Sequence, residues 1–495
     1  MGEVDEIKSW LKVILKNENV EDLTVEIVGN SEKGDGYVGD IVFVDVAAVT
    51  KGGTKKGYHL VLKCAKRSKA LREKSPVKEA FLNEIYVYDT LFPSFMKFQQ
   101  ERGVKDPFDK VPKCYGTFTT ENMEVIALEN LKKNGYILWD RKKPLTRAHI
   151  DMVVKEYGKY HAISIAMKTQ QPDTFKQLEQ GIVDTFTKFL ESTGMVSVFA
   201  NIVDEVYDLL KDDLDGTIMS KWKNFKHTIG PFFKKIRQGT EGLQVIVHGD
   251  CWSNNFMYQQ TKDVPTRVAI LDWQLASVTS PILDLSYFLF ATLSKEDMDD
   301  LDVILKNYHN SFINYVKNLG TDSEHLYPFE QFLEDWKKYS KYGIIMTNMI
   351  HKYSLSEQDE VPDMAQAAES GHSVHPARFS NSTYTKHPSS NVSRSGGLQF
   401  DGGLVAGESS LVVGLVPSGV LVHGDDEVVG RRRPRRRRSV VALGELLRAE
   451  TLQRISPLPC NIICIDISEK LRKTKLNKSW AKFLREAHES EMKLC

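Results

Sequence analysis

The stretch VIVHGDCWSNNFM, residues Val245–Met257, carries the clearest structural signal in the chain. Its apolar start predicts a buried strand, which leads into a His-Gly-Asp turn. Asn255 follows the aspartate of this turn, Asp250, by five positions, and a second apolar strand over residues 267–271 ends at Asp272. Because polar side chains follow both strands, the pattern predicts that two carboxylates and one amide lie close together.

Two carboxylates with an amide between them suit phosphoryl transfer. One carboxylate can accept the proton of an attacking hydroxyl, while the other and the amide hold the metal ion that bridges the phosphates. Oxygen atoms are the ligands that Mg²⁺ prefers. Asp250 or Asn255 alone would more often cap a turn, and His423-Gly424-Asp425 repeats the tripeptide without the later Asn or strand. The complete spacing, rather than the tripeptide, therefore indicates a phosphotransferase.

A lysine and a glutamate in the N-terminal part give independent support. Lys63 ends the apolar strand His59–Lys63, where a charge is unexpected unless it is paired. Glu84 shares the apolar face of the helix expected over residues 77–91, so it also needs a partner. A Lys–Glu pair beside nucleotide phosphates is a feature of kinases. The alternative is that Lys63 extends to solvent and Glu84 lies at the edge of the apolar face.

The remaining pattern predicts a small β-rich lobe followed by a larger helical lobe. A helix from Ile7 to Leu15 precedes alternating β-branched residues over 22–50, which a glycine-rich turn interrupts. In that turn Gly34 and Gly36 would let backbone N–H groups approach phosphates, although hairpins often contain such glycines. The other expected elements are a helix over 77–91 that stops at Pro93, a strand pair over 113–131, and helices over 146–168, 173–194, 197–213, 218–238, 295–318 and 328–350.

The composition changes sharply in the last third of the chain. Lys386 is the only lysine between residues 353 and 469, and this stretch is rich in Ser, Gly, His and Pro. We therefore expect a low-complexity, mostly disordered insert over residues 356–465, either a lineage insertion or a wrongly joined exon. Its Arg431–Arg438 run is a targeting signal, an acidic-partner site or, more commonly, a solvated patch. A helix expected over 466–495 would return to the helical lobe.

The overall composition argues against several classes of protein. Lys+Arg and Asp+Glu both number 66, so a nucleic-acid binder that works through bulk charge is not expected. The six cysteines form no CxxC pair, which argues against a disulfide framework or a zinc knuckle. The acidic N-terminus lacks the order of a signal peptide, and no apolar run is long enough for a membrane span. We therefore expect a cytoplasmic protein of unknown oligomeric state.

The chain resembles the ecdysteroid kinase-like family, also called CHK kinase-like, in the aminoglycoside and choline phosphotransferase branch of the protein-kinase-like fold. The resemblance spans about residues 5–355 and resumes near 465–490. Trp252, two residues after Asp250, is typical of this family. The motifs that carry the resemblance are HGDCWSNNFMY (His248–Tyr258), ILDWQ (Ile270–Gln274), SPILDLSYFLF (Ser280–Phe290), LENL (Leu128–Leu131), KYHAISIA (Lys159–Ala166) and FLNEIYVYDTLFP (Phe81–Pro93).

This resemblance implies an α+β, bilobal protein-kinase-like fold with ATP and Mg²⁺ as cofactors. Residues 1–130 would form the nucleotide-binding N-lobe, and residues 131–355 would form the helical C-lobe with the catalytic loop and metal site. The implied roles are a catalytic base for Asp250, metal ligands for Asn255 and Asp272, nucleotide contacts for Lys63, Glu84, Gly34, Gly36, Glu129 and Leu131, and structural support for His248 and Asp284.

The implied function is ATP-dependent phosphorylation of a hydroxyl on a lipophilic alcohol such as an ecdysteroid or a related steroid or xenobiotic. One alternative is a non-catalytic pseudokinase, against which the intact Lys63, Asp250 and Asp272 argue. Another is a kinase of choline-like or aminoglycoside-like substrates. A protein kinase is disfavoured because the HRD and DFG-APE motifs are absent. The expected partner is a small-molecule hydroxyl acceptor, without nucleic acid and without a membrane span.

Overall fold

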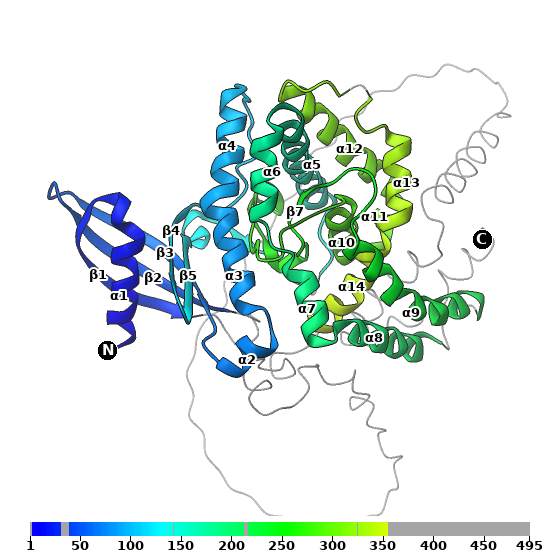
Figure 1. The fold of residues 1–495 in the computed structure, drawn as a ribbon, viewed down its shortest axis with the longest axis horizontal. Helices are drawn as coiled ribbons and strands as arrows, with labels where there is room; N and C mark the ends of the chain where they lie inside the picture. Colours follow the sequence, from blue (N-terminus) through cyan, green and yellow to red (C-terminus); the bar gives the residue numbers. More distant parts are fainter. Residues whose placement is uncertain (1, 31–38, 142, 212–215, 324, 355–495) are drawn as a thin grey trace, which may run out of the picture. The chain divides into compact units, whose positions relative to one another are not determined.

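The computed structural model describes residues 2–30, 39–141, 143–211, 216–323 and 325–354. In this part an N-terminal antiparallel sheet is followed by a larger helical part, which confirms the expected α+β, kinase-like architecture (Figure 1). Contacts divide the chain into one unit of Met1–Phe379 with Ala449–Cys495 and a second of Ser380–Arg448. The second unit, the expected insert and the expected C-terminal helix lie outside the described residues.

The N-terminal sheet has five strands in the order β1-β2-β3-β5-β4, and all neighbours are antiparallel. These are β1 (Val20–Asn30), β2 (Gly39–Thr50), β3 (Lys55–Ala65), β4 (Cys114–Thr120) and β5 (Met123–Glu129). Leu60 and Leu62 of β3 pack in one apolar core with residues of helix α1 (Glu3–Ile14). Because side chains alternate along a strand, Lys63 projects from the opposite face of the sheet.

After β3, helix α2 (Lys69–Lys74) precedes a longer helical stretch. This stretch comprises α3 (Val77–Tyr86), a π-helical turn η2 (Val87–Leu91) and α4 (Phe92–Glu101). The expectation that the helix stops at Pro93 is wrong, because Pro93 lies in the first turn of α4. The π turn just before Pro93 changes the helical hydrogen bonding, so the stretch accommodates a residue that has no N–H group to donate.

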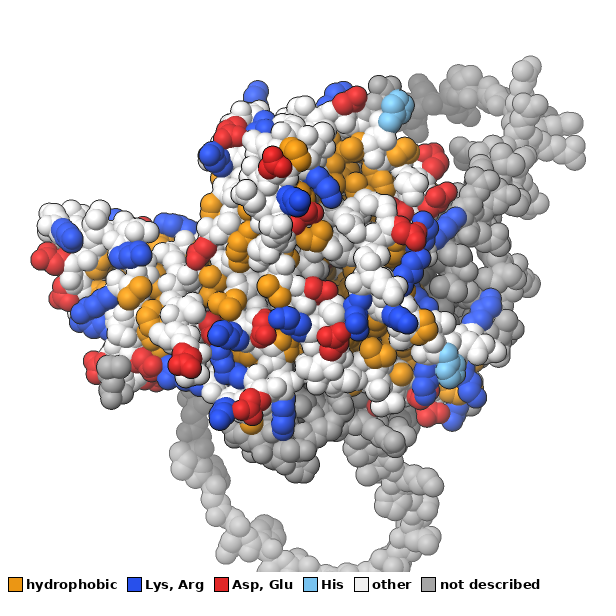
Figure 2. Space-filling view, viewed as in Figure 1, with side chains coloured by type: hydrophobic (Ala, Val, Ile, Leu, Met, Phe, Trp, Pro, Cys, Tyr) orange, Lys and Arg blue, Asp and Glu red, His pale blue; other side chains and the backbone are white. Residues whose placement is uncertain are grey.

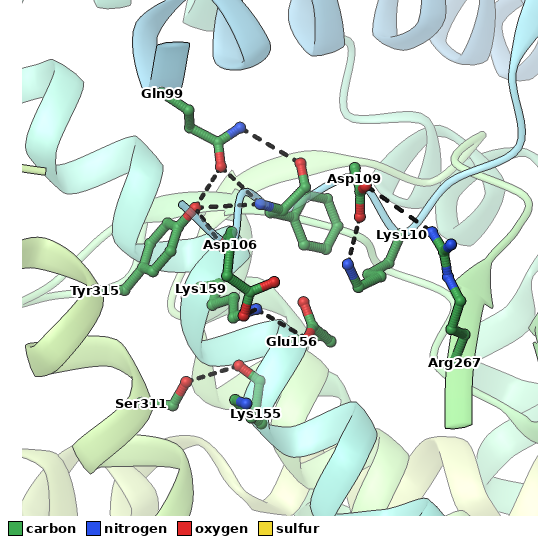
Figure 3. A network of polar contacts seen from close by, with 11 residues as sticks. Gln99, Asp106, Asp109, Lys110, Lys155, Glu156, Lys159, Arg267, Ser311 and Tyr315 are labelled. Atoms are coloured by element: carbon green, nitrogen blue, oxygen red, sulfur yellow. Dashed lines mark hydrogen bonds and ion pairs between the residues drawn. The ribbon is translucent and has the colours of Figure 1, made fainter. Parts of the chain in front are cut away.

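The loop from α4 to β4 is tied to the helical part by a polar network (Figure 3). Asp106 of this loop lies 2.5 Å from the ammonium of Lys159, which also contacts Glu156 at 3.0 Å. Further along the loop, the carbonyl of Lys110 accepts a hydrogen bond from Ile270 N at 2.7 Å. The loop therefore supports the strand that leads directly to Asp272.

Two small sheets carry the central motif. β7 (Val245–Val247) pairs with β10 (Ser277–Thr279), and β8 (Phe256–Thr261) lies between β6 (Ile137–Leu138) and β9 (Val264–Ile270). Phe256 pairs with Ile270 in the hairpin of β8 and β9. Asn255, just before β8, and Asp272, just after β9, therefore emerge at the same end of this hairpin.

The helical part contains ten α-helices among the described residues. They are α5 (Arg147–Gln170), α6 (Pro172–Gly181), α7 (Thr185–Thr193), α8 (Met195–Leu210), α9 (Gly216–Arg237), α10 (Ile282–Thr292), α11 (Lys295–Met298), α12 (Leu301–Asn318), α13 (Phe329–Tyr339) and α14 (Lys341–Ser354). The single helix expected over 173–194 is two helices, because Asp184 caps α7 by accepting a hydrogen bond from Thr187 N. Helix α10 has no polar face, since all its residues are buried, so its periodicity gave no signal.

Surface charge on the visible face is mixed. In Figure 2, Lys and Arg side chains are interspersed with Asp and Glu side chains over the described residues. None of the described helices is both long and apolar enough to cross a membrane. The mixed charge on this face does not indicate a binding surface that acts through charge of a single sign.

Candidate active site

Lys63 connects three segments of the chain at the centre of the site. Its ammonium lies 2.5 Å from Glu84 Oε2 on α3 and 2.7 Å from Asp272 Oδ1 after β9. Burial alone would lower the pKa of Lys63, which is 8% exposed. The charges of Asp272 and Glu84 outweigh burial and hold the pKa of Lys63 above its ordinary value. Lys63 is therefore a charged side chain shared by two acids.

Glu84 is fully enclosed and has a partner for each carboxylate oxygen. Oε2 contacts Lys63, and Oε1 accepts a hydrogen bond from Trp273 N at 3.3 Å. Burial raises the pKa of Glu84 to about 7, while the charge of Lys63 opposes this rise. The ion pair with Lys63 is the one expected from the sequence, and the contact with Trp273 adds a link to the segment after β9.

Asp250 has both carboxylate oxygens in contact with neighbouring donors. Asn255 Nδ2 donates to Asp250 Oδ2 at 3.0 Å and to its backbone carbonyl at 2.9 Å. The hydroxyl of Tyr287 donates to Oδ1 at 3.3 Å. Burial, together with the charge of Asp272, raises the pKa of Asp250 to about 7. A carboxylate with a raised pKa is a stronger base than a free one, which suits proton transfer near neutral pH.

Asp272 stands in an uncommon backbone conformation. Its φ is 63°, in the left-handed region that residues other than glycine seldom adopt. The preceding residue, Leu271, donates its N–H to the carbonyl of Asn255 at 2.9 Å. Residues held in such conformations cluster at functional sites. Here the turn brings the carboxylate of Asp272 to Lys63, while the backbone of the preceding Leu271 is bonded to Asn255.

Asn255 and Asp272 provide oxygen donors of the kind that a magnesium ion needs. The Nδ2 of Asn255 donates to Asp250, which leaves the Oδ1 of Asn255 for a cation, and Asp272 contacts Lys63 through its Oδ1. Over the described residues, no cluster of three or more His, Cys, Asp or Glu side chains could hold a metal ion. A metal site here would therefore depend on the amide oxygen of Asn255 beside Asp272.

Asp284 holds the backbone of the catalytic loop from within α10. It is 1% exposed and accepts hydrogen bonds from His248 N at 2.6 Å and Gly249 N at 2.8 Å. His161 Nε2 lies 3.2 Å from the same carboxylate. Burial alone would raise the pKa of Asp284, but the contacts with His161 and His248 hold it below its ordinary value. Asp284 is therefore a charged group whose partners are all buried.

His248 joins the two strand ends that carry the acids. Its Nδ1 accepts a hydrogen bond from Asp250 N at 3.2 Å, so its Nε2 donates to the carbonyl of Leu271 at 2.8 Å. Burial lowers the pKa of His248, which keeps the ring neutral. The next residue, Gly249, has φ +86°, and a Cβ there would lie 2.2 Å from the carbonyl oxygen of Leu275. Only glycine fits this turn without displacing the backbone.

The segment after β5 carries Glu129 and Leu131. Glu129 Oε2 accepts a hydrogen bond from Lys113 N at 3.2 Å. Leu131 begins the 3₁₀ helix η3 (Leu131–Asn134), whose first N–H groups have no acceptor within the helix. Leu131 shares an apolar cluster with Met257, and Leu271 packs against it. Met257 and Leu271 are additional candidates for contact with the nucleotide that the sequence analysis missed. The only sequence signal that could have indicated them is that each lies within two residues of a predicted metal ligand.

A cavity of about 500 Å³ adjoins the catalytic loop. Gly249 and Leu275 line it on the loop side, while Phe186 of α7 and Tyr342 of α14 contribute aromatic walls. Polar groups, including Asp184, also line it. The cavity thus combines apolar and polar walls beside the loop that carries Asp250. Two predicted phosphate-contacting residues, Gly34 and Gly36, lie outside the described residues.

Comparisons with known proteins identify the family of the chain. The sequence profile of the ecdysteroid kinase-like family matches residues 33–321, which is more than half of the chain. None of the curated proteins compared with the chain matches it. Among solved structures, the GDP complex of wild-type aminoglycoside 2'-phosphotransferase-IIIa is 12% identical, with a TM-score of 0.36 and coverage of 74% of this chain and 97% of that one.

Two further solved structures are similar at the same low level of identity. The GDP and kanamycin complex of an aminoglycoside phosphotransferase is 12% identical, with a TM-score of 0.37 and coverage of 74% of this chain and 96% of that one. A glucosamine kinase in complex with glucosamine, ADP and inorganic phosphate is 10% identical, with a TM-score of 0.28 and coverage of 75% and 98%. On the family match over residues 33–321, the chain belongs to the ecdysteroid kinase-like family and is a small-molecule kinase.

Proposed function

We propose that the protein transfers a phosphoryl group from ATP to a hydroxyl group of a lipophilic alcohol, such as an ecdysteroid or a related steroid or xenobiotic. The observation that carries the proposal is one continuous set of contacts. Lys63 contacts Asp272 at 2.7 Å, Asn255 contacts Asp250 at 3.0 Å, and Leu271 N joins the two strand ends through the carbonyl of Asn255. These are the side chains that phosphoryl transfer requires.

In this proposal Asp250 is the catalytic base. It accepts the proton of the acceptor hydroxyl as the new oxygen–phosphorus bond forms and the bond from the γ-phosphorus to the bridging oxygen breaks, which releases ADP. The raised pKa of Asp250, about 7, supports this role because a general base works best with a pKa near the working pH. His248 and Asp284 keep the loop in place through the backbone contacts described above.

The nucleotide phosphates would lie between Lys63 and the two metal ligands. Lys63 would contact the α- and β-phosphates, with Glu84 holding its ammonium in position. Asn255 and Asp272 would hold Mg²⁺, which when bound offsets phosphate charge. Gly34 and Gly36 remain proposed contacts to the phosphates through their backbone N–H groups.

The adenine ring would lie beside the segment after β5. The backbone of Glu129 and Leu131 would provide its hydrogen bonds, since the first N–H of η3 has no helical acceptor. Met257 and Leu271 would contact one face of the ring, because both belong to the apolar cluster that includes Leu131.

The cavity beside Gly249 is the proposed acceptor site. Its volume of about 500 Å³ lies within the usual range of ligand pockets. The aromatic walls from Phe186 and Tyr342 support an apolar body, and the polar groups nearby support an acceptor with several hydroxyls. This combination favours a hydroxylated steroid over a small cation such as choline.

The direct test is an incubation with Mg-ATP and a panel of alcohols. We expect a steroid with several hydroxyl groups to gain one phosphate, measured by mass spectrometry, and Asp250→Asn to lower that turnover on the order of 10²–10⁴-fold. If only choline or an aminoglycoside gained phosphate, the proposed lipophilic substrate would be wrong, and the enzyme would be a kinase of that other class of alcohol. Full turnover in Asp250→Asn would overturn the assigned base.

Two other candidates are separated by simple measurements. Stabilisation of the protein by Mg-ATP in a thermal shift assay, without transfer to any alcohol, would favour a pseudokinase. Incorporation of labelled phosphate into protein rather than into the small-molecule fraction would favour a protein kinase.

We also propose a cytoplasmic location. Cys64, Cys114 and Cys251 are free cysteines, as expected in a reducing compartment. Recovery of the protein from a secreted or membrane fraction, after cell fractionation, would contradict this location.

A further inference from the structure

We propose that Tyr287 is a positioning residue that holds the carboxylate of Asp250 in the orientation for proton transfer; this inference rests on the proposed role of Asp250 as the base. The hydroxyl of Tyr287 donates to Asp250 Oδ1 at 3.3 Å.

The two oxygens of Asp250 are held from two different elements. Asn255, at the start of the β8 hairpin, donates to Oδ2, and Tyr287, on α10, donates to Oδ1. The terminal torsion of an aspartate is soft, so a single hydrogen bond would leave the carboxylate free to rotate. Donors on both oxygens restrict this rotation, because a turn of the carboxylate would lengthen one bond or the other; the side chain of Trp252 is a further hydrogen-bond partner of Asp250.

Tyr287 extends a pattern that Asp284 begins. The two residues are three apart on α10, so they lie on neighbouring turns of the same face. Asp284 accepts the backbone N–H groups of His248 and Gly249, and Tyr287 reaches the side chain of the next residue, Asp250. One face of α10 therefore contacts three consecutive residues of the catalytic loop.

The position of Tyr287 is itself fixed by α14. Its side chain is fully buried, and its ring packs edge-on against Tyr342 with the ring centroids 6.2 Å apart. The preceding residue on α10, Ser286, accepts a hydrogen bond from Gly343 N at 3.2 Å, and a Cβ at Gly343 would lie 2.3 Å from the Ser286 backbone. Helices α10 and α14 are thus closely packed here, and this packing together with the Tyr342 contact restricts the movement of the Tyr287 ring.

The test compares Tyr287→Phe with Tyr258→Phe. Both changes remove one hydroxyl from a fully buried ring, but the hydroxyl of Tyr258 has no hydrogen-bond partner. A hydrogen bond to a charged group contributes enough for its loss to lower kcat about tenfold. We expect that loss in Tyr287→Phe, with unchanged KM for Mg-ATP and for the alcohol, and no loss in Tyr258→Phe. The assay uses the most reactive alcohol of the panel, or phosphate release from Mg-ATP to water if none reacts.

A double-mutant cycle separates this inference from the proposed function. If Tyr287 acts through Asp250, Tyr287→Phe should change the residual rate of Asp250→Asn less than twofold. Equal losses of kcat in Tyr287→Phe and Tyr258→Phe, or a tenfold loss that persists in the Asp250→Asn background, would overturn the positioning role. Full activity of Asp250→Asn would instead overturn the base assignment on which the role rests.

Discussion

The two ends of the site are held by different kinds of interaction. The catalytic loop, from His248 to Asn255, is held by α10, where the buried Asp284 accepts two backbone N–H groups. The Lys63 end is held by ion pairs between side chains from β3, α3 and the turn after β9. The first set consists of backbone N–H groups and a buried carboxylate, none of which has a proposed contact with substrate. The second set uses the lysine and carboxylate that nucleotide and metal would also contact.

This difference indicates which part of the site is built in advance. Backbone contacts to a buried carboxylate do not compete with ligand, so the orientation of Asp250 is preorganised before nucleotide binds. Lys63 and Asp272 form an ion pair at 2.7 Å, which the proposed phosphates and metal ion would have to replace. Changes at the loop end should therefore reduce both stability and turnover, while changes at the Lys63 end should reduce mainly turnover.

The largest effect is expected at the loop end. Asp284→Ala leaves two buried N–H groups and the His161 ring without their shared acceptor, so the free energy of unfolding should fall by about 3–5 kcal/mol. Turnover should be lost as well. Chemical denaturation measures the first effect, and the exposed Asp173→Ala serves as the control. A loss near that of Asp173→Ala would show that α10 does not hold the loop.

The next effect is expected at the Lys63 end. Lys63→Met should lower turnover on the order of 10²–10³-fold, because it removes the cation proposed to face the phosphates. The free energy of unfolding should fall less than in Asp284→Ala, since Glu84, with its pKa raised to about 7, can become neutral. Steady-state kinetics and denaturation are compared with Lys56→Met, which breaks an exposed ion pair on the same strand. If Lys63→Met lost as much stability as Asp284→Ala, the proposed difference between the two ends of the site would be wrong.

A smaller effect separates steric fit from backbone strain in the loop. Gly249→Ala combines a positive φ with a Cβ 2.2 Å from the carbonyl of Leu275, whereas Gly53→Ala has a positive φ and no atom within 4 Å. Gly53→Ala should cost about 1–2 kcal/mol, the usual cost of the left-handed conformation. Gly249→Ala should cost more and also lower kcat. Equal losses of stability in the two variants, measured by thermal unfolding, would mean that the loop rearranges to accommodate the added Cβ atom.

The smallest effect concerns pH and His309, a partly buried histidine of α12. Burial lowers the pKa of His309, so the unfolded chain binds a proton there before the folded chain does. Its contribution to stability is present above the unfolded pKa, near 6.5, and is lost as pH falls below it. The raised pKa values of Asp250 and Glu84 give a slope of the opposite sign. The free energy of unfolding is therefore measured for both the parent protein and His309→Gln from pH 6.5 to 5. We expect it to fall less steeply with pH in His309→Gln than in the parent.

Local pattern predicted most of the elements but not all of their limits. The strands before Lys63 and Asp250 were predictable because their apolar residues lie next to isolated polar ones. The continuation of the helix through Pro93 was not predictable. A proline ordinarily indicates the end of a helix, and nothing in the sequence indicates the π turn that precedes it. The lobe boundaries at residues 130 and 355, and the roles of the site residues, stay predictions.

The sequence by itself determined which chemical groups the site contains. Lys63, Asp250, Asn255 and Asp272 stand out beside apolar strands, and Glu84 stands out on the apolar face of a helix, because polar residues in such places need partners. The sequence also indicated that Lys63 pairs with Glu84, but only the tertiary structure decided that Lys63 is shared with Asp272 and that Tyr287 contacts Asp250. The physical reason is that α10 is buried on every side, so its sequence has no polar face to indicate that it binds the catalytic loop.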